Sequence, residues 1–253
     1  MNIDGMPAIV TGAASGLGEG TARALAAKGA KVTLLDMNGD RLEQVAAEIG
    51  GLPILCDVTD ATDAEVAVAK AHETHGACAI AVNCAGIAPA AKIVGRDGPM
   101  DLDAFRRVIE VNLIGTFNML RLTAADMATR EPNEDGERGV IVNTASIAAF
   151  EGQIGQAAYA ASKGGVVGLT LPAAREFART GVRVNAIAPG LFGTPMLLGM
   201  PQEVQDSLTS TLPFPQRFGK PEEYAALVVH MAENTVMNGE CVRLDSALRM
   251  QPR

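Results

Sequence analysis

The sequence predicts an α/β protein built on a parallel β-sheet with helices on both faces. Short apolar runs alternate with longer helical patterns along the whole chain, which is typical of a doubly wound sheet. The apolar runs are β-branched or aliphatic almost throughout, without strict polar alternation, as expected for strands covered on both faces. No internal repeat or flexible linker interrupts this pattern. We therefore expect one domain over residues 1–253, with about seven strands.

The predicted strands are the runs Ala8–Thr11, Val32–Asp36, Pro53–Asp57, Ile80–Asn83, Gly139–Asn143, Arg183–Ala188 and Glu240–Leu244. The predicted helices between them cover residues 16–28, 39–49, 60–75, 101–129, 154–179 and 221–233. Two segments break the rhythm. Glu131–Arg138 is polar and is expected to be an exposed loop. Residues 190–211 carry Gly, Pro and Met beyond a strand end, where open α/β sheets bind ligands. We expect a substrate loop there, with a merely variable loop as the alternative.

Composition excludes several classes of protein. The 21 basic and 29 acidic residues give a net charge of −8, which argues against a nucleic-acid binder. The apolar runs are shorter than the ~18 residues of a membrane span. The N-terminus shows neither a secretory nor an Arg-rich leader pattern. The four cysteines have no CxxC or metal-ligand spacing. We therefore expect a cytoplasmic protein without a catalytic metal.

A glycine-rich turn, TGAASGLG, follows the first predicted strand and opens a helix. Glycines let backbone amides approach a pyrophosphate, and a helix N-terminus favours its charge. The alternative is a tight turn without a ligand. The context favours a dinucleotide site whose candidate residues are Gly12, Ser15, Gly16, Leu17 and Gly18.

Asp36, at the end of the second strand, points to the choice of dinucleotide. A carboxylate there can bind both ribose hydroxyls of adenosine and repel a 2′-phosphate. Like charges ~4 Å apart repel by roughly 1–4 kcal/mol near a surface, which favours NAD over NADP about ten- to thousand-fold. Arg41 lies close in sequence and weakens this argument. The alternative role for Asp36 is to cap the next helix.

The third and fourth strands end in further candidates. Asp57 and Val58 could receive the adenine amine and ring, or could belong to the N-cap region of the helix that begins near Asp60. Asn83, Ala85 and Gly86 place small residues where the cofactor backbone would pass.

Tyr159 and Lys163 are four residues apart on a predicted helix, so their side chains face the same way. A tyrosine needs roughly 4 kcal/mol of preference for phenolate to act as a base near pH 7. One ammonium ~5 Å away supplies about 3 kcal/mol at an effective dielectric constant of ~20. A positively charged nicotinamide ring could supply the remainder. The pair therefore suits acid/base chemistry beside an oxidised dinucleotide.

Together these motifs make the chain resemble the short-chain dehydrogenase/reductase family over its whole length. The matching motifs are TGAASGLG, NCAG at 83–86, Asn112, Ser146, Tyr159-x-x-x-Lys163 and Pro189-Gly190 with Thr194. The stretches VNLIGTFNMLRL, NTASIAAFEGQIGQAAYAASKGG and APGLFGTPML are most similar to the type 2 3-hydroxyacyl-CoA dehydrogenases of that family, also known as multifunctional 17β-hydroxysteroid dehydrogenases. The tail LDSALRMQP supports that subgroup. The resemblance implies a Rossmann-type sheet of seven strands and a homotetramer.

The resemblance also implies roles for individual residues. Tyr159 would be the general acid/base, and Ser146 would hydrogen-bond the substrate oxygen and the tyrosine. Lys163 would hold the nicotinamide ribose and lower the pKa of Tyr159. Asn112 would anchor a water in a proton relay.

Four further positions would bind cofactor or substrate by the same resemblance. Thr194 and the backbone at Pro189 and Gly190 would hold the carboxamide, and Gln153 would lie beside the substrate carbonyl. The chain departs from the subgroup at Ser246, where glycine is usual, and at 95–101, which is shorter than the insertion of the mitochondrial relatives near the substrate entrance.

The implied activity is NAD-dependent interconversion of a secondary alcohol and a ketone. The first-choice substrate is an (S)-3-hydroxyacyl-CoA of fatty-acid or branched-chain oxidation. The alternatives are a 3-oxoacyl-carrier-protein reductase, a hydroxysteroid dehydrogenase and a non-enzymatic scaffold. A polyanionic CoA thioester needs positive potential at the site mouth, for which the candidates are Lys92, Arg96, Arg217 and Lys220.

Overall fold

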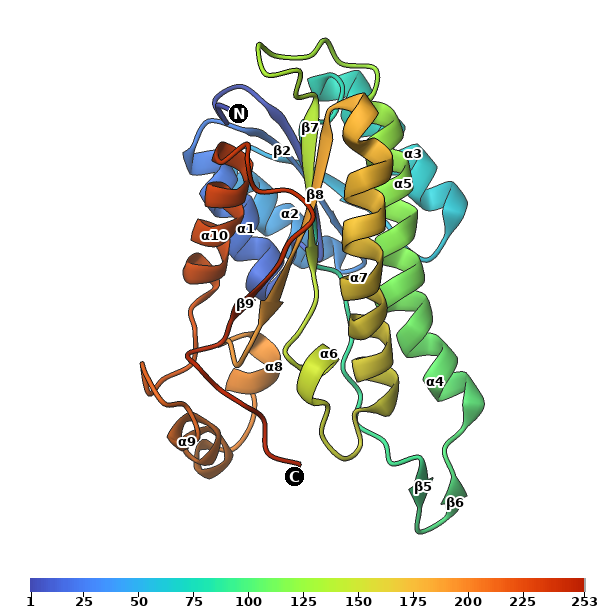
Figure 1. The fold of residues 1–253 in the computed structure, drawn as a ribbon, viewed down its shortest axis with the longest axis vertical. Coiled ribbons are helices and arrows are strands. Elements are labelled where there is room, and N and C mark those ends of the chain that lie inside the picture. Colours follow the sequence, from blue (N-terminus) through green and yellow to red (C-terminus); the bar gives the residue numbers. More distant parts are fainter. Residues whose placement is uncertain (253) are drawn as a thin grey trace.

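Seven parallel strands form the central sheet of the computed structural model, which describes residues 1–252 except the side chain of Met196 (Figure 1). The strand order is β3-β2-β1-β4-β7-β8-β9. The strands are β1 (Pro7–Thr11), β2 (Lys31–Asp36), β3 (Leu52–Leu55), β4 (Ile80–Asn83), β7 (Gly139–Thr144), β8 (Val182–Pro189) and β9 (Cys241–Leu244). The predicted sheet is confirmed. Its order reverses between β1 and β4, which creates the crevice where such sheets bind ligands.

Helices cover both faces of the sheet (Figure 1). On one face pack α1 (Gly16–Ala27), α2 (Gly39–Ile49) and α10 (Pro221–Glu233). On the other pack α3 (Ala61–His75), α5 (Gly115–Met127) and α7 (Ala157–Glu176). No described helix is both long enough and apolar enough to cross a membrane.

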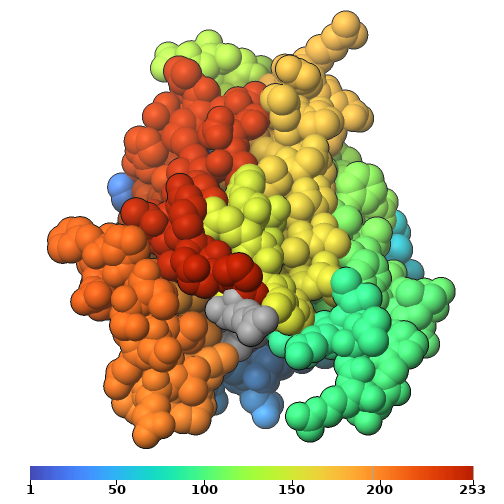
Figure 2. All heavy atoms as spheres, turned by 60° about the horizontal axis from the view of Figure 1, so that its bottom comes forward, coloured from blue at the N-terminus to red at the C-terminus, as the bar shows by residue number. Residues whose placement is uncertain are grey.

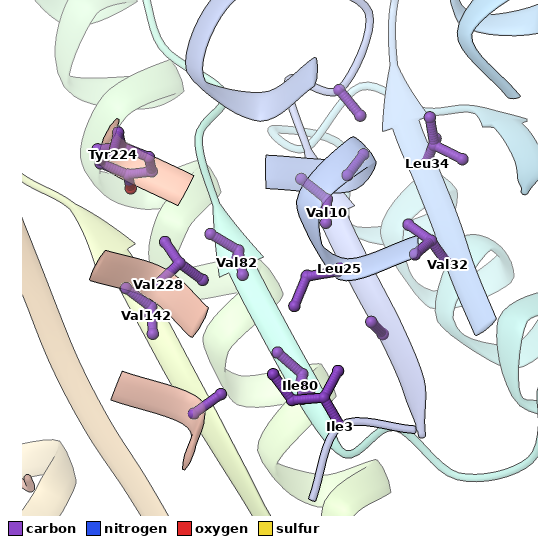
Figure 3. Packing of buried hydrophobic residues seen from close by; sticks show 14 of the residues in the cluster. Ile3, Val10, Leu25, Val32, Leu34, Ile80, Val82, Val142, Tyr224 and Val228 are labelled. Atoms are coloured by element: carbon purple, nitrogen blue, oxygen red, sulfur yellow. The ribbon is translucent and has the colours of Figure 1, made fainter. Parts of the chain in front are cut away.

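The strand side chains feed two separate cores. In β1, Val10 belongs to the core beneath α1 and α10, whereas Ile9 points to the core beneath α3 and α5. In β7, Val142 and Ile141 divide in the same way. Figure 3 shows the first core, with Val10, Val82 and Val142 from three strands lying near Leu25 and Tyr224 from the helices. Because both cores are apolar, the strands show no polar alternation.

The predicted helix over 101–129 is divided. It comprises α4 (Leu102–Ile109), a π-helical turn (Glu110–Ile114) and α5. A π-turn inside a helix commonly marks a functional position, and this one carries the buried Asn112. The helix predicted over 154–179 begins later, at Ala157, because Gly155 has φ +90°. It ends in a 3-10 turn, Phe177–Thr180.

Short elements gather at the carboxyl ends of the strands. They are α6 (Ala148–Glu151), α8 (Pro195–Leu198), α9 (Gln202–Ser210) and a small hairpin of β5 (Val94–Gly95) and β6 (Gly98–Pro99). Figure 2 looks onto this end, where the orange segment with α8 and α9 and the green segment with the hairpin and α4 stand on opposite sides. The predicted loop over 190–211 therefore contains two helices.

The polar segment 131–138 is a loop as predicted, but it is not exposed throughout. Glu137 is buried, and its carboxylate pairs with the Arg183 guanidinium at 2.7 Å and with the N-terminal ammonium of Met1 at 3.3 Å. Arg183 also donates to the carbonyls of Met231 and Ala232 in α10. The buried carboxylate is therefore paired with two cations, one at each oxygen, which offsets part of the cost of burying its charge.

Candidate active site

A cleft of about 390 Å³ opens beyond the carboxyl ends of β1 to β4. Eleven of the predicted cofactor residues line it: Gly12, Ser15, Gly16, Leu17, Gly18, Asp36, Asp57, Val58, Ala85, Gly86 and Thr194. They come from five separate loops, and the fold brings them together at the point where the strand order reverses.

The glycine-rich turn is shaped to bring its backbone to this cleft. Gly12 and Gly16 have φ of +65° and +56°, a region that favours glycine. A Cβ on Gly12 would lie 2.8 Å from the backbone nitrogen of Ala85, so the first and fourth strand ends touch only because Gly12 has no side chain. Ser15 is the N-cap of α1 but its hydroxyl does not cap the helix. The first amides of α1 therefore face the cleft free to bind an anion.

Asp36 joins the end of β2 to this turn. Its carboxylate accepts hydrogen bonds from the backbone amides of Ala14 (3.0 Å) and Asn38 (2.9 Å). Asn38 caps α2 through its side chain, so Asp36 is not the helix cap. The guanidinium of Arg41 is bound to both carboxylate oxygens of Glu19, at 2.8 and 3.0 Å. That ion pair occupies the Arg41 guanidinium, which is therefore not free to receive a 2′-phosphate.

At the end of β3, Asp60 is the N-cap of α3 and accepts from the amides of Thr62 and Asp63. Asp57 is therefore not the N-cap itself, although it lies in the turn that leads into α3. The Asp57 carboxylate instead holds Thr59 through its amide (2.9 Å) and hydroxyl (2.7 Å). This turn leaves Asp57 and Val58 in the cleft wall.

Asn83 supports the cleft without lining it. Its buried amide donates to Asn143 Oδ1 in the neighbouring strand at 2.8 Å. The next two backbone amides, of Cys84 and Ala85, both donate to the Thr11 hydroxyl at 3.1 Å. These bonds fix the turn of β4 against the glycine-rich turn.

Tyr159 and Lys163 lie on one face of α7, as their spacing predicts. The Lys163 ammonium is 5.9 Å from the centroid of the Tyr159 ring. It is buried and donates to the carbonyl of Thr144 at 2.7 Å. Ser146 follows β7, is buried, and accepts from the Ala148 amide at 3.1 Å. The three predicted catalytic side chains therefore come from β7 and α7, beside the cleft.

Burial shifts the pKa values of both titratable groups. It lowers the pKa of Lys163 to about 8. Burial also raises the pKa of Tyr159, and a hydrogen bond with the Ser146 side chain partly opposes that rise. In the protein alone the phenol is therefore protonated at neutral pH, which differs from the lowered pKa that the sequence predicts. Burial outweighs the attraction of the ammonium because it penalises the charged form of both groups.

Asn112 sits in the π-turn with its side chain fully used. Its Oδ1 accepts from the Ile87 amide at 2.8 Å, and its Nδ2 donates to the Ile87 carbonyl at 2.9 Å and to Ser162 Oγ at 3.0 Å. A Cβ on Gly86 would lie 3.1 Å from Asn112 Oδ1 and 3.6 Å from the Lys163 ammonium. Asn112 thus clamps the cleft loop beside Lys163, and its water-anchoring role stays a prediction.

The remaining candidates lie around the cleft. Gln153 Nε2 donates to the carbonyl of Gln251 at 2.8 Å and lines a second pocket of about 340 Å³. Pro189 accepts from the Ile147 amide and Gly190 donates to Leu244, and neither lines the first cleft. Their backbone bonds instead fix the end of β8, from which the chain continues to Thr194.

Sequence reasoning missed several lining residues, among them Met37, Arg107 and Val111. Arg107 and Val111 are four residues apart in the run through α4 and the π-turn, so they share a helix face. That spacing, next to the VNLIG motif, was the available signal. Met37 simply follows Asp36 and is 60% exposed.

The cleft residues fit a nicotinamide dinucleotide. The free amides at the start of α1 and the glycines of the turn suit a pyrophosphate, and the Asp36 carboxylate suits a ribose. At position 86 only glycine fits, because a side chain there would crowd Asn112 and Lys163. Among residues 1–252, no three His, Cys, Asp or Glu side chains cluster as a metal site.

Comparison with known proteins agrees with this geometry. The sequence model of the short chain dehydrogenase family matches residues 7–204. The chain is 51% identical to the 3-hydroxyacyl-CoA dehydrogenase type-2 of Bos taurus over 99% of this chain and 98% of that protein. It is 36% identical to a 3-oxoacyl-[acyl-carrier-protein] reductase of Thermotoga maritima, over 98% of this chain and 99% of that protein.

A crystal structure of 3-hydroxyacyl-CoA dehydrogenase type-2 from Mycobacterium avium has the same fold. It superposes with a TM-score of 0.94 at 43% identity, over 98% of each chain. Family, fold and site agree along almost the whole length. The chain is therefore an oxidoreductase that belongs to the short-chain dehydrogenase family and uses a nicotinamide cofactor.

Proposed function

We propose that this enzyme interconverts (S)-3-hydroxyacyl-CoA and 3-oxoacyl-CoA with NAD as its cofactor. The choice of NAD rests on Asp36. Its carboxylate is fixed at the cleft, while the nearby Arg41 is bound to Glu19. The similarity to 3-hydroxyacyl-CoA dehydrogenases type-2, at 51% identity over 99% of the chain, supports the substrate class. We place the reaction in fatty-acid or branched-chain acyl-CoA oxidation.

The chain's own residues move the proton. In ketone reduction the Tyr159 hydroxyl donates its proton to the substrate oxygen, and in alcohol oxidation the phenolate takes the proton back. Ser146 hydrogen-bonds the same oxygen and orients it. Lys163, held by the Thr144 carbonyl, keeps a positive charge beside the phenol. When bound, the nicotinamide supplies or accepts the hydride, and its oxidised ring favours the phenolate.

The acyl-CoA arm has a place to bind beside Gln153. The second pocket is lined by Gln153 together with Lys92, Ile93, Val94 and Ile154. The last three are apolar side chains more than half exposed, which suits an acyl or pantetheine chain. Lys92 offers a cation for CoA phosphates. Arg217 is a weaker candidate because its guanidinium is bound to Glu223 at 2.6 Å.

We also propose that the enzyme is a homotetramer. A groove of about 520 Å³ runs between α5 and α7 and is lined by apolar side chains that include Phe117, Leu169, Pro172 and Phe177. Of these side chains, Phe117 is 51% exposed. Covering this face with another copy would bury them. Light scattering of the purified protein tests the stoichiometry.

Two enzymatic alternatives keep the same residues. A 3-oxoacyl-carrier-protein reductase is favoured by the Thermotoga maritima relative, at 36% identity. A hydroxysteroid dehydrogenase would use the same alcohol chemistry. Initial rates with acetoacetyl-CoA, an acetoacetyl carrier protein and a 17β-hydroxysteroid distinguish the three. The highest kcat/KM for the CoA thioester is expected, and a preference for either other substrate would overturn the assignment.

We retain a cytoplasmic location as part of the proposal. Support comes from the cysteines Cys56, Cys78, Cys84 and Cys241, which are all free thiols in the structure. Cell fractionation with an antibody against the protein tests it, and recovery of the protein in an organelle or secreted fraction would contradict it.

A further inference from the structure

Among residues 1–252, Arg107 is a cleft-lining arginine whose side chain has no protein partner. It lies in the last turn of α4, is exposed, and lines the same cleft as the glycine-rich turn. Within residues 1–252 its guanidinium makes no hydrogen bond and no ion pair. Its neighbour Arg106 differs, because that guanidinium donates to Asp103 at 2.7 Å. An exposed arginine that faces a ligand cleft without a protein partner is available to bind an anion.

The other charged side chains that line the cleft are acidic. Among the described side chains that line it, Asp36 and Asp57 are carboxylates and Arg107 is the one cation. The whole chain carries a net charge of −8. A dinucleotide brings two further negative charges in its pyrophosphate. The Arg107 guanidinium therefore offsets part of the negative charge that a pyrophosphate meets in this cleft.

The end of α4 forms part of the cleft wall, and Arg107 lies on it. Val111 lies one turn further along the same helical run and also lines the cleft, so the two side chains share a face. Asn112 follows Val111 and clamps Ile87 in the loop after β4. The π-turn therefore ties the helix that carries Arg107 to the wall of the cleft.

We propose that Arg107 binds the pyrophosphate of the dinucleotide together with the backbone amides at the N-terminus of α1. The proposal rests on the dinucleotide site proposed above and does not depend on the acyl-CoA assignment. The amides of α1 and the guanidinium then divide the two phosphates between them, and Asp36 takes the ribose. The protein needs this cation because the α1 amides carry only partial positive charge.

Equilibrium binding tests the proposal with matched variants. Arg107→Gln should weaken binding of NADH and of ADP-ribose about tenfold, the loss expected for one charge-assisted contact. Adenosine, which has no phosphate, should bind both proteins with equal affinity. Arg107→Lys should recover most of the lost affinity. Arg106→Gln, on the same helix turn, should bind NADH as the wild type does.

Salt dependence provides a second readout. Raising the ionic strength should weaken NADH binding to the wild type more steeply than to Arg107→Gln, since the variant has lost the screened charge. The proposal is overturned if Arg107→Gln changes NADH affinity by less than about twofold, or if adenosine loses affinity as much as ADP-ribose does. Unchanged thermal unfolding of both arginine variants would show that the comparison is between folded proteins. If Arg107→Gln is not folded, Arg107→Ala takes its place in the same comparison with ADP-ribose and adenosine, and the same outcomes decide.

Discussion

The ammonium of Lys163 lies 5.9 Å from the centroid of the Tyr159 ring while it donates to the Thr144 carbonyl. The lysine is thus anchored to the end of β7, and the tyrosine is brought to it by one turn of α7. Thr144 in turn bonds the hydroxyl of the second tyrosine, Tyr224, at 2.7 Å. A buried network behind the site therefore fixes the lysine beside Tyr159.

Tyr159→Phe should lower kcat by two or more orders of magnitude, because it removes the group that transfers the proton. Affinity for NADH should stay within a few-fold of the wild type. The other tyrosine of the chain provides the control. Tyr224→Phe should lose stability through its buried hydroxyl contact with Thr144 but keep kcat within several-fold. Near-native turnover by Tyr159→Phe would show that Tyr159 is not the general acid/base.

Asp36→Ala should raise the ratio of NADPH to NADH efficiency at least tenfold, since the variant no longer repels a 2′-phosphate. The measurement is kcat/KM for both cofactors with one ketone substrate. Asp40→Ala removes an exposed carboxylate in the first turn of α2 and should leave the ratio unchanged. An unchanged ratio in Asp36→Ala would mean that another group selects the cofactor.

The charged form of the buried Lys163 lowers the stability of the folded protein. Burial lowers its pKa from 10.5 to about 8, so the folded state binds fewer protons than the unfolded state between these values. Stability should therefore rise with pH through that window and be lowest, by roughly 3 kcal/mol, below pH 8. Lys163→Met should then be more stable than the wild type at pH 7 while being inactive.

Thermal unfolding of the two proteins from pH 7 to pH 10.5 checks this linkage. The advantage of Lys163→Met should shrink as the pH rises, because the wild-type lysine then loses its charge. The difference between the two proteins isolates this group from the other titrating side chains. A constant or growing difference would contradict a depressed lysine pKa.

Ser246 should be a site where glycine stabilises the protein. Its φ of 55° lies in the left-handed region, which costs a residue with a side chain about 1 kcal/mol. Ser246→Gly should raise the free energy of unfolding by about 0.5–1 kcal/mol. Ser207→Gly, within α9, should lower it by a similar amount. Denaturant unfolding measures both, and destabilisation by Ser246→Gly would contradict the strain argument.

The sequence was sufficient to predict the sheet, because the strands are buried on both faces and read as apolar runs. The residues at their carboxyl ends, such as Gly12, Asp36 and Val58, could be placed at the cleft by topology alone. The π-turn could not be predicted, since a single extra residue in a helical turn leaves the apolar pattern of 101–129 almost unchanged.

Side-chain partners were also beyond the sequence. Nothing in the pattern of 131–138 distinguishes the buried Glu137 from its exposed neighbours, because its partner Arg183 lies far along the chain. Likewise the bond between Gln153 and the Gln251 carbonyl joins the site to the tail across 98 positions. Long-range contacts of this kind follow from the assembled fold, which local periodicity does not encode.

The activity proposed for this protein is NAD-dependent dehydrogenation of 3-hydroxyacyl-CoA thioesters. Initial-rate reduction of acetoacetyl-CoA at neutral pH, with NADH against NADPH, tests it most directly. We predict fast turnover with NADH and at least tenfold lower efficiency with NADPH, since Asp36 stands at the adenosine ribose site. A preference for NADPH, or no turnover of acetoacetyl-CoA by protein that binds NADH, would contradict the account.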